Sequence, residues 1–125
     1  MMKSKPNPKT GLARIWAAFF YSLDGLRAAI ANEAAFRQEC YAVAAALFVL
    51  IFLPLSPAWK GLLFLAATAV LVVELLNSSI ESVVDMASPE YHVLAKRAKD
   101  FGSAAVLVIL VVNVILWGCG LFTMF

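Results

Sequence analysis

The stretch VLVVELLNSSIESVVD, residues Val70–Asp85, decides the fold of this chain. It opens as an apolar run that is too long for an ordinary soluble strand, and it then carries polar side chains at helical spacing. On a 3.6-residue period these polar residues fall within an arc of roughly 100°. They are Glu74, Asn77, Ser78, Glu81 and Asp85. The stretch predicts a helix with one acidic face and one face that is apolar enough for lipid.

Glu74 is predicted to lie deep in a membrane. If the helix ends near Asp85 and rises about 1.5 Å per residue, Glu74 lies roughly 17 Å back along its axis. An acidic side chain at this depth costs on the order of 3 kcal/mol to insert, so it normally faces a partner, a water-filled cleft or an ion. The plainer alternative is that Glu74 and Glu81 only bond to neighbouring helices. The number of polar groups on one face favours a functional site.

The composition is that of an integral membrane protein. Hydrophobic residues make up 63% of the 125 residues and charged residues only 14%, which is well outside the range of soluble domains. The length supports one domain over residues 1–125. The charged residues do not form a pattern that resembles a nucleic-acid-binding surface. Cys40 and Cys119 have no other potential metal ligands near them in the sequence, so we expect both to be packing residues.

The pattern along the chain predicts three transmembrane helices and one surface helix. Residues 1–11 are basic and carry two prolines, so we expect a mobile tail there. Residues 12–31 mix aromatic and charged side chains, which suits a helix lying in the plane of the membrane interface. The transmembrane helices are expected at about residues 34–53, 59–85 and 100–122.

Basic residues set the expected orientation. They gather in the N-terminal region and in the connector between the second and third spans, whereas the first connector has only Lys60 and the C-terminus has none. The positive-inside rule therefore places the N-terminus and the second connector in the cytoplasm and the C-terminus outside. With this topology Glu33, Glu81 and residues 96–100 meet at the cytoplasmic interface.

The polar groups at this interface suggest chemistry on a phosphate donor. Carboxylates at the water side can hold a hard cation such as Mg²⁺, which is commonly shared with substrate phosphates. Neighbouring lysines and arginines can hold the phosphates themselves. The deeper Glu74 could then accept a proton from the hydroxyl of a lipid. We therefore expect transfer of a group from a soluble, metal-bound phosphate donor to a membrane-resident acceptor, although no P-loop or kinase glycine loop occurs in the sequence.

Two other classes of function remain open on these residues. A small proton-coupled transporter could use Glu74 as its proton carrier, but it does not explain why Glu33, Glu81 and Lys99 should gather at one interface. A purely structural membrane protein leaves the acidic face unexplained beyond helix pairing. Under any of these interpretations we expect an oligomer, because three short spans offer few internal partners for buried polar groups.

Polar and small residues outside the acidic face have plainer interpretations. A lone loop histidine such as His92 is more often a solvated side chain than a functional one. Asn113, in the third span, is expected to bond to a neighbouring helix. Residues 102–105, with the sequence GSAA, make the start of that span thin enough for a close helix approach.

Three blocks of the sequence closely resemble the small bacterial diacylglycerol kinase family. They are GLRAAIANEAAFRQE (25–39), VELLNSSIESVVD (73–85) and EYHVLAKRAKDFGSAAV (90–106). The similarity runs in order and with matching spacing from Gly11 to about Leu116. It implies a homotrimer in the bacterial inner membrane that makes phosphatidic acid from diacylglycerol and MgATP, at composite sites between neighbouring subunits. A sister branch phosphorylates undecaprenol, so the choice of lipid stays open.

The resemblance also implies a role for each matching residue. Glu74 would be the general base for the lipid hydroxyl, and Asn77 would orient Glu74 and the phosphates. Glu33 and Glu81 would hold Mg²⁺ on the ATP phosphates. Besides these two glutamates, the nucleotide site would be lined by Arg14, Tyr21, Glu90, Tyr91, His92, Lys99 and Asp100. The lipid substrate would be bordered by Ala35, Phe36, Arg37, Gln38, Glu39, Glu74 and Ser103.

Overall fold

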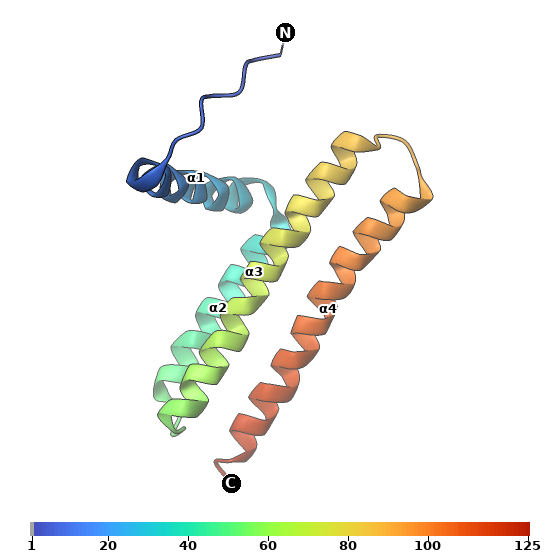
Figure 1. Ribbon diagram of the computed structural model, residues 1–125. Helices are drawn as coiled ribbons and strands as arrows, with labels where there is room; N and C mark the ends of the chain where they lie inside the picture. Colours follow the sequence, from blue (N-terminus) through green and yellow to red (C-terminus); the bar gives the residue numbers. More distant parts are fainter. Residues whose placement is uncertain (1) are drawn as a thin grey trace. The chain divides into compact units, whose positions relative to one another are not determined.

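Four α-helices make up the regular structure of residues 2–125, the part of the chain that the computed structural model describes. In chain order they are α1 (Gly11–Asn32), α2 (Ala34–Phe52), α3 (Pro57–Ala87) and α4 (Val93–Phe122) (Figure 1). These residues contain no β-strand, and α2, α3 and α4 are long and apolar enough to cross a membrane. The expected all-α class with three transmembrane helices is therefore confirmed.

The first of two compact units ends at Glu33 and contains α1. Gly11 begins this helix with a φ of 60°, a left-handed value that favours glycine. Trp16 and Phe20 are both exposed and meet edge to face, with ring centroids 5.3 Å apart. Farther along, Asp24 and Arg27 form an exposed ion pair of 3.3 Å. Exposed aromatic and charged groups on one helix suit the membrane interface, and that position for α1 stays a prediction.

The second unit, Ala34–Phe125, is an antiparallel arrangement of α2, α3 and α4. Figure 1 shows α3 between the other two helices, and α3 packs against both of them. The apolar core lies along this central helix. Its buried members repeat at intervals of about three, four or seven residues, as one stripe of a packed helix requires. They are Phe36, Val43 and Leu50 of α2 and Leu63, Ala66, Ala67 and Val70 of α3.

A short turn joins α2 to α3. Ser56 caps the start of α3 by accepting a hydrogen bond of 3.2 Å from the Trp59 backbone N–H, and Pro57 occupies a first-turn position where its missing N–H costs nothing. Lys60 Nζ donates to the carbonyl of Ile51 at 3.0 Å. Lys60 thereby satisfies one of the last carbonyls of α2, which have no partner within their own helix.

The connector between α3 and α4 is shorter than its sequence suggests. α3 ends at Ala87 and α4 begins at Val93, so residues that were expected in a loop up to Lys99 are already helical. The cause is a local cap, because His92 Nδ1 accepts a hydrogen bond of 3.1 Å from the Leu94 backbone N–H. His92 therefore has a structural role that its isolated position in the sequence does not indicate.

α3 and α4 approach closely at both ends of their contact. Gly102 and Gly120 are the buried residues of α4, and between them Asn113 Nδ2 donates to the carbonyl of Ala66 on α3 at 2.8 Å. The predicted bond from Asn113 to a neighbouring helix is confirmed. The expected close approach at residues 102–105 is also confirmed, since Gly102 faces α3 directly.

Substitution of Asn113 by leucine tests this interhelical bond. We expect the free energy of unfolding in detergent to fall by roughly 0.5–1 kcal/mol, the usual worth of a hydrogen bond between membrane helices. Val114→Leu is the matched control, because Val114 is exposed. Equal unfolding free energies for the two variants would show that the Asn113 bond contributes nothing.

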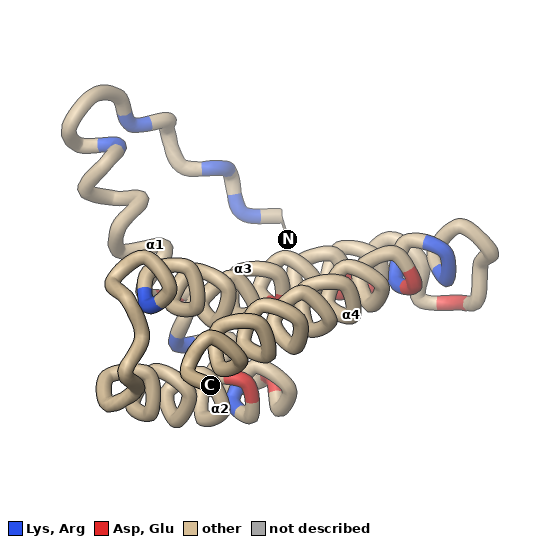
Figure 2. Tube along the Cα trace, turned by 90° about the horizontal axis from the view of Figure 1, so that it is seen from below, with Lys and Arg blue, Asp and Glu red and all other residues tan. Residues whose placement is uncertain are grey.

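Large apolar side chains cover the outward faces of the second unit. Phe64, Val72 and Val114 expose 54%, 56% and 74% of their surface, which a protein surrounded by water would avoid. Figure 2 shows that the charged residues of α4 lie at the end next to the connector and that the rest of this helix carries none. These outward faces suit contact with lipid or with further helices. The chain is therefore a multi-pass membrane protein.

Candidate functional site

The polar face of α3 passes from buried to exposed along the helix. Glu74 and Asn77 expose only 6% and 8% of their surface, and they are the buried polar residues of the described chain. One turn farther on, Glu81 is half-buried, and Asp85 at the next turn is exposed. The face therefore leads from a protected carboxyl group to charged groups beside the connector.

Glu39 of α2 lies beside Glu74. The two carboxyl groups are close enough to interact electrostatically, and Glu39 Oε2 is buried with no hydrogen-bond partner within residues 2–125. Two acidic side chains from different helices therefore meet inside the second unit. The family resemblance placed Glu39 at the border of the lipid substrate, and the sequence pattern did not predict its contact with Glu74. An acidic residue inside each of two predicted spans was the available signal.

Asn77 connects the buried and half-buried parts of the face. Its Nδ2 atom donates to Glu81 Oε1 at 3.4 Å, a long hydrogen bond between successive turns of α3. Its Oδ1 atom is buried and has no N–H or O–H partner in the described part of the chain. Asn77 therefore contacts Glu81, and the role that the sequence resemblance implies for it, toward Glu74 and the phosphates, stays a prediction.

A polar cavity of about 390 Å³ lies at the connector between α3 and α4. It brings together several of the residues expected at the nucleotide site. They are Glu90, Tyr91, His92, Lys99 and Asp100, with Asp85 and Lys96 beside them. These groups come from the end of α3, the connector and the first turns of α4, so the short connector gathers them.

Two ion pairs lie in the wall of this cavity. Lys99 Nζ lies 2.5 Å from Asp85 Oδ1 across the two helices, and Lys96 Nζ lies 2.6 Å from Asp100 Oδ2 one turn apart on α4. All four side chains are at least 42% exposed, so water screens both pairs and each contributes little to stability. Such pairs exchange readily for an anionic ligand, and a lysine is a common phosphate ligand.

The remaining expected nucleotide residues belong to the first unit. Arg14 and Tyr21 line a hollow of about 350 Å³ together with Lys9 and the prolines of the N-terminal tail. Glu33 follows the last turn of α1, and its backbone N–H bonds to the Ala29 carbonyl at 2.9 Å. Arg14 and Tyr21 thus lie two turns apart on one helix and line the same hollow.

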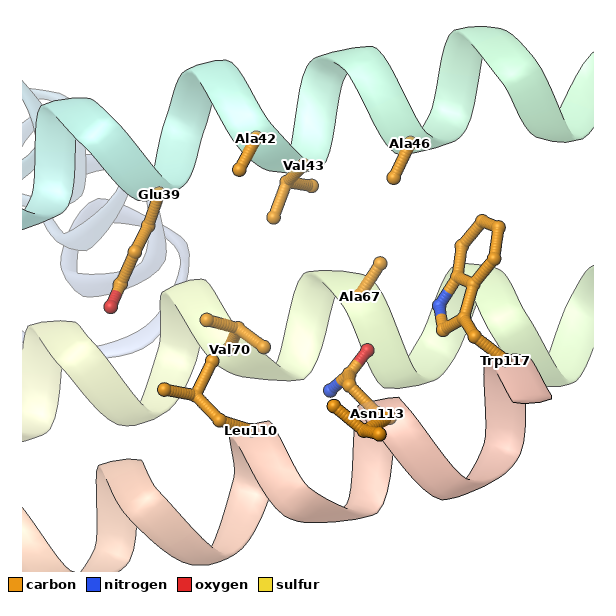
Figure 3. A pocket seen from close by; sticks show the side chains of 10 residues that line it. Glu39, Ala42, Val43, Ala46, Ala67, Val70, Leu110, Asn113 and Trp117 are labelled. Atoms are coloured by element: carbon orange, nitrogen blue, oxygen red, sulfur yellow. The ribbon is translucent and has the colours of Figure 1, made fainter.

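An apolar cavity of about 310 Å³ lies along the middle of the second unit, with walls from α2, α3 and α4 (Figure 3). Figure 3 shows Glu39 at one end and Trp117 at the other. Its walls between them are narrow side chains and aliphatic groups, among them Ala42, Ala46, Ala67 and Val70. A hydrocarbon chain could lie here with a polar group at the Glu39 end.

The other residues expected at the lipid border differ in burial. Ala35, Gln38 and Ser103 are exposed, and Arg37 is half-buried. Phe36 exposes only 2% of its surface, so within this chain it is a packing residue. Of the expected set, Glu39 and Glu74 are the pair that the structure brings together.

Glu33 and Glu81 as ligands of Mg²⁺ stay a prediction. Residues 2–125 contain no group of three or more His, Cys, Asp or Glu side chains placed to hold a metal ion. Glu81 nevertheless presents a half-buried carboxylate that Asn77 bonds. Carboxylate oxygen is the ligand type that Mg²⁺ prefers, and this ion usually needs only one or two protein carboxylates because waters and phosphates complete its shell.

Comparison with known proteins identifies relatives along most of the chain. A family model described as prokaryotic diacylglycerol kinase matches residues 20–121. The diacylglycerol kinase of Escherichia coli strain K12 is 50% identical over 111 residues, which cover 89% of this chain and 91% of the relative. The diacylglycerol kinase of Helicobacter pylori strain J99 is 43% identical over 129 residues, covering 100% and 98%. That of Pseudomonas aeruginosa PAO1 is 44% identical over 115 residues, covering 90% and 94%.

Proposed function

This chain belongs to the prokaryotic diacylglycerol kinase family, and we propose that it transfers the γ-phosphoryl group of ATP to the hydroxyl of diacylglycerol to make phosphatidic acid. The observation that carries the proposal is the polar face of α3. It links a buried carboxyl group, Glu74, through Asn77 and Glu81 to the charged cavity at the connector. A lipid acceptor and a soluble phosphate donor need such a path from lipid to water.

Glu74 serves as the general base in this proposal. The lipid hydroxyl oxygen bonds to the γ-phosphorus while the bond from that phosphorus to the bridging oxygen of ADP breaks, and the hydroxyl proton passes to Glu74. Glu74 accepts this proton in its carboxylate form. Transfer is direct and in line, so no phosphorylated side chain forms. Positioning of the two substrates supplies much of the rate enhancement.

The cavity at the connector holds the nucleotide phosphates. Lys99 exchanges Asp85 for a phosphate oxygen, and the neighbouring Glu90–His92 and Asp100 complete the wall of the cavity. Arg14 and Tyr21 contribute from α1. Glu33 and Glu81 are the carboxylates that would hold Mg²⁺. Bound Mg²⁺ would neutralise charge on the transferring phosphoryl group.

The lipid is held in part by the apolar cavity of the second unit. Its hydrocarbon occupies the space walled by Ala42, Ala46 and Ala67, and its hydroxyl lies at the Glu39 end. Residues 35–39, Glu74 and Ser103 border the headgroup. A cavity of this kind accepts apolar chains by shape and burial rather than by specific polar contacts.

We propose that the chain is one lipid-kinase domain in the bacterial inner membrane. Residues 2–10 form a tail, α1 lies on the cytoplasmic surface, and α2, α3 and α4 span the bilayer with the C-terminus outside. The assembly is a homotrimer with sites shared between subunits. The buried polar groups support an assembly, because three short spans offer them few internal partners.

Phosphate transfer from labelled ATP to two lipids tests the proposed function. The purified protein is assayed in mixed micelles with Mg²⁺, once with diacylglycerol and once with undecaprenol. We expect strong labelling of diacylglycerol. Labelling of undecaprenol alone would support the proposed phosphoryl transfer but would show that the lipid substrate is undecaprenol. Absence of label in both lipids, from protein shown to be folded, would reject a lipid kinase and favour a transporter that uses Glu74.

A further inference from the structure

Gly102 leaves a space in α4 that the Asn77 side chain occupies. A Cβ atom built on Gly102 would collide with Asn77 Oδ1 and would lie 3.2 Å from Asn77 Cγ and 3.9 Å from its Cα. No real Cβ tolerates the first of these contacts. An alanine at position 102 would therefore force the Asn77 amide group to move.

Backbone freedom does not explain this glycine. Gly102 lies inside α4 and does not have a positive φ, so any residue could adopt its conformation. Glycine in the interior of a helix is less favourable than alanine. Its presence at the contact with α3 is explained by the side chain that it accommodates.

The space at Gly102 and the hydrogen bond to Glu81 together fix the orientation of the Asn77 amide. Oδ1 lies against Gly102, and Nδ2 on the opposite side of the amide donates to Glu81 at 3.4 Å. Asn77 is 8% exposed, so neighbouring atoms restrict any other orientation. If Oδ1 were pushed out of its space, Nδ2 would turn away from Glu81.

We infer that Gly102 is a positioning residue which, through Asn77, sets the orientation of the Glu81 carboxylate toward the metal-bound nucleotide. This inference rests on the proposed function for the role of Glu81. It adds a residue that contacts neither substrate. Gly102 acts through the space that it leaves open.

Two other glycines of α4 provide matched controls. A Cβ on Gly118 would meet nothing within 4 Å. A Cβ on Gly120 would lie 3.1 Å from Leu63 Cδ1 and 3.2 Å from Trp59 Cε3, so it would disturb packing at the end of the helix pair away from the connector. Gly118→Ala measures the effect of a methyl group alone, and Gly120→Ala measures the effect of disturbed packing alone.

The experiment is a double-mutant cycle between positions 102 and 77. Steady-state kinetics in mixed micelles give kcat and the KM for MgATP for the unchanged protein, Gly102→Ala, Asn77→Ala and the double variant. We expect Gly102→Ala to raise the KM for MgATP by about 3- to 10-fold, the worth of one hydrogen bond. In the Asn77→Ala background, where the collision is relieved, Gly102→Ala should change the KM by less than about 2-fold. Gly118→Ala and Gly120→Ala should leave it unchanged.

Several outcomes would overturn the inference. An unchanged KM in Gly102→Ala would do so, and so would an equal effect of that substitution with and without Asn77. Loss of folding in Gly102→Ala that persists in the double variant would show that Gly102 serves helix packing independently of Asn77.

A second readout separates this inference from the proposed function. The side-chain amide resonances of Asn77 in an NMR spectrum should shift in Gly102→Ala and stay in place in Gly118→Ala. If the unchanged protein fails to phosphorylate lipid, the proposed function is wrong, and the resonances still decide whether Gly102 positions Asn77. Unshifted resonances would reject that positioning whatever the activity.

Discussion

Replacement of Glu74 by glutamine is expected to lower kcat for phosphorylation of diacylglycerol by about 10²- to 10⁴-fold, the usual contribution of a general base. Glutamine has nearly the same shape, so it keeps the packing of a side chain that is only 6% exposed. It cannot accept the hydroxyl proton. Because Glu74 lies away from the connector cavity, the KM for MgATP should stay near that of the unchanged protein. Measurement of both constants in mixed micelles checks the prediction.

Glu39→Gln is the matched control for this substitution. An amide at position 39 has nearly the same shape as the carboxyl group and can donate a hydrogen bond to the neighbouring Glu74 carboxylate, so Glu74 keeps its ability to accept a proton. We expect a smaller loss of kcat than in Glu74→Gln. Near-normal turnover in Glu74→Gln would remove the general-base role from Glu74. An equal loss in both variants would assign the proton transfer to the pair as a unit.

Replacement of Glu81 by alanine should mainly weaken the engagement of metal and nucleotide. The variant removes one of the two carboxylates proposed to hold Mg²⁺, and a hydrogen bond or contact to a charged group is worth enough to raise the KM for MgATP by about 10- to 100-fold. Asn77 also loses its hydrogen-bond acceptor. Titration of activity with MgATP and with free Mg²⁺ measures the effect.

Ser82→Ala controls for a substitution in the same turn. Ser82 is exposed, and its hydroxyl only donates to the Ser78 carbonyl at 2.9 Å, so the KM for MgATP should not change. Partial recovery of Glu81→Ala at high Mg²⁺ would support a role in metal binding. The assignment of Glu81 fails if Glu81→Ala and Ser82→Ala have the same KM as the unchanged protein.

Much of the fold could be predicted from periodicity and composition. The spacing of polar residues on an apolar background identified the buried face of α3, and the long uncharged runs identified the spans. Asn113 was predicted to bond to a neighbouring helix because a lone amide inside a span has no water to bond. The small residues after Asp100 predicted a close approach, and Gly102 provides it.

The partners of the site residues could not be predicted in the same way. Periodicity places a residue on a face of its own helix, but the residue that faces it across the interface depends on the rotation and register of the two helices. The proximity of Glu39 to Glu74, the Lys99–Asp85 ion pair and the contact of Gly102 with Asn77 all depend on that register. The early start of α4 escaped prediction for another reason. It results from a histidine cap, a weaker signal in sequence than Ser, Thr, Asp or Asn.

Single-turnover transfer is the most direct test of the central claim, that Glu74 activates a lipid hydroxyl for direct attack on ATP. The protein, in excess over labelled ATP, is mixed with Mg²⁺ and diacylglycerol and quenched at successive times, for the unchanged chain and for Glu74→Gln. The account predicts that label moves from ATP to phosphatidic acid without appearing on the protein, and that Glu74→Gln slows this step while still binding ATP. Label that appears first on the protein, or an equal rate in the two proteins, would contradict it.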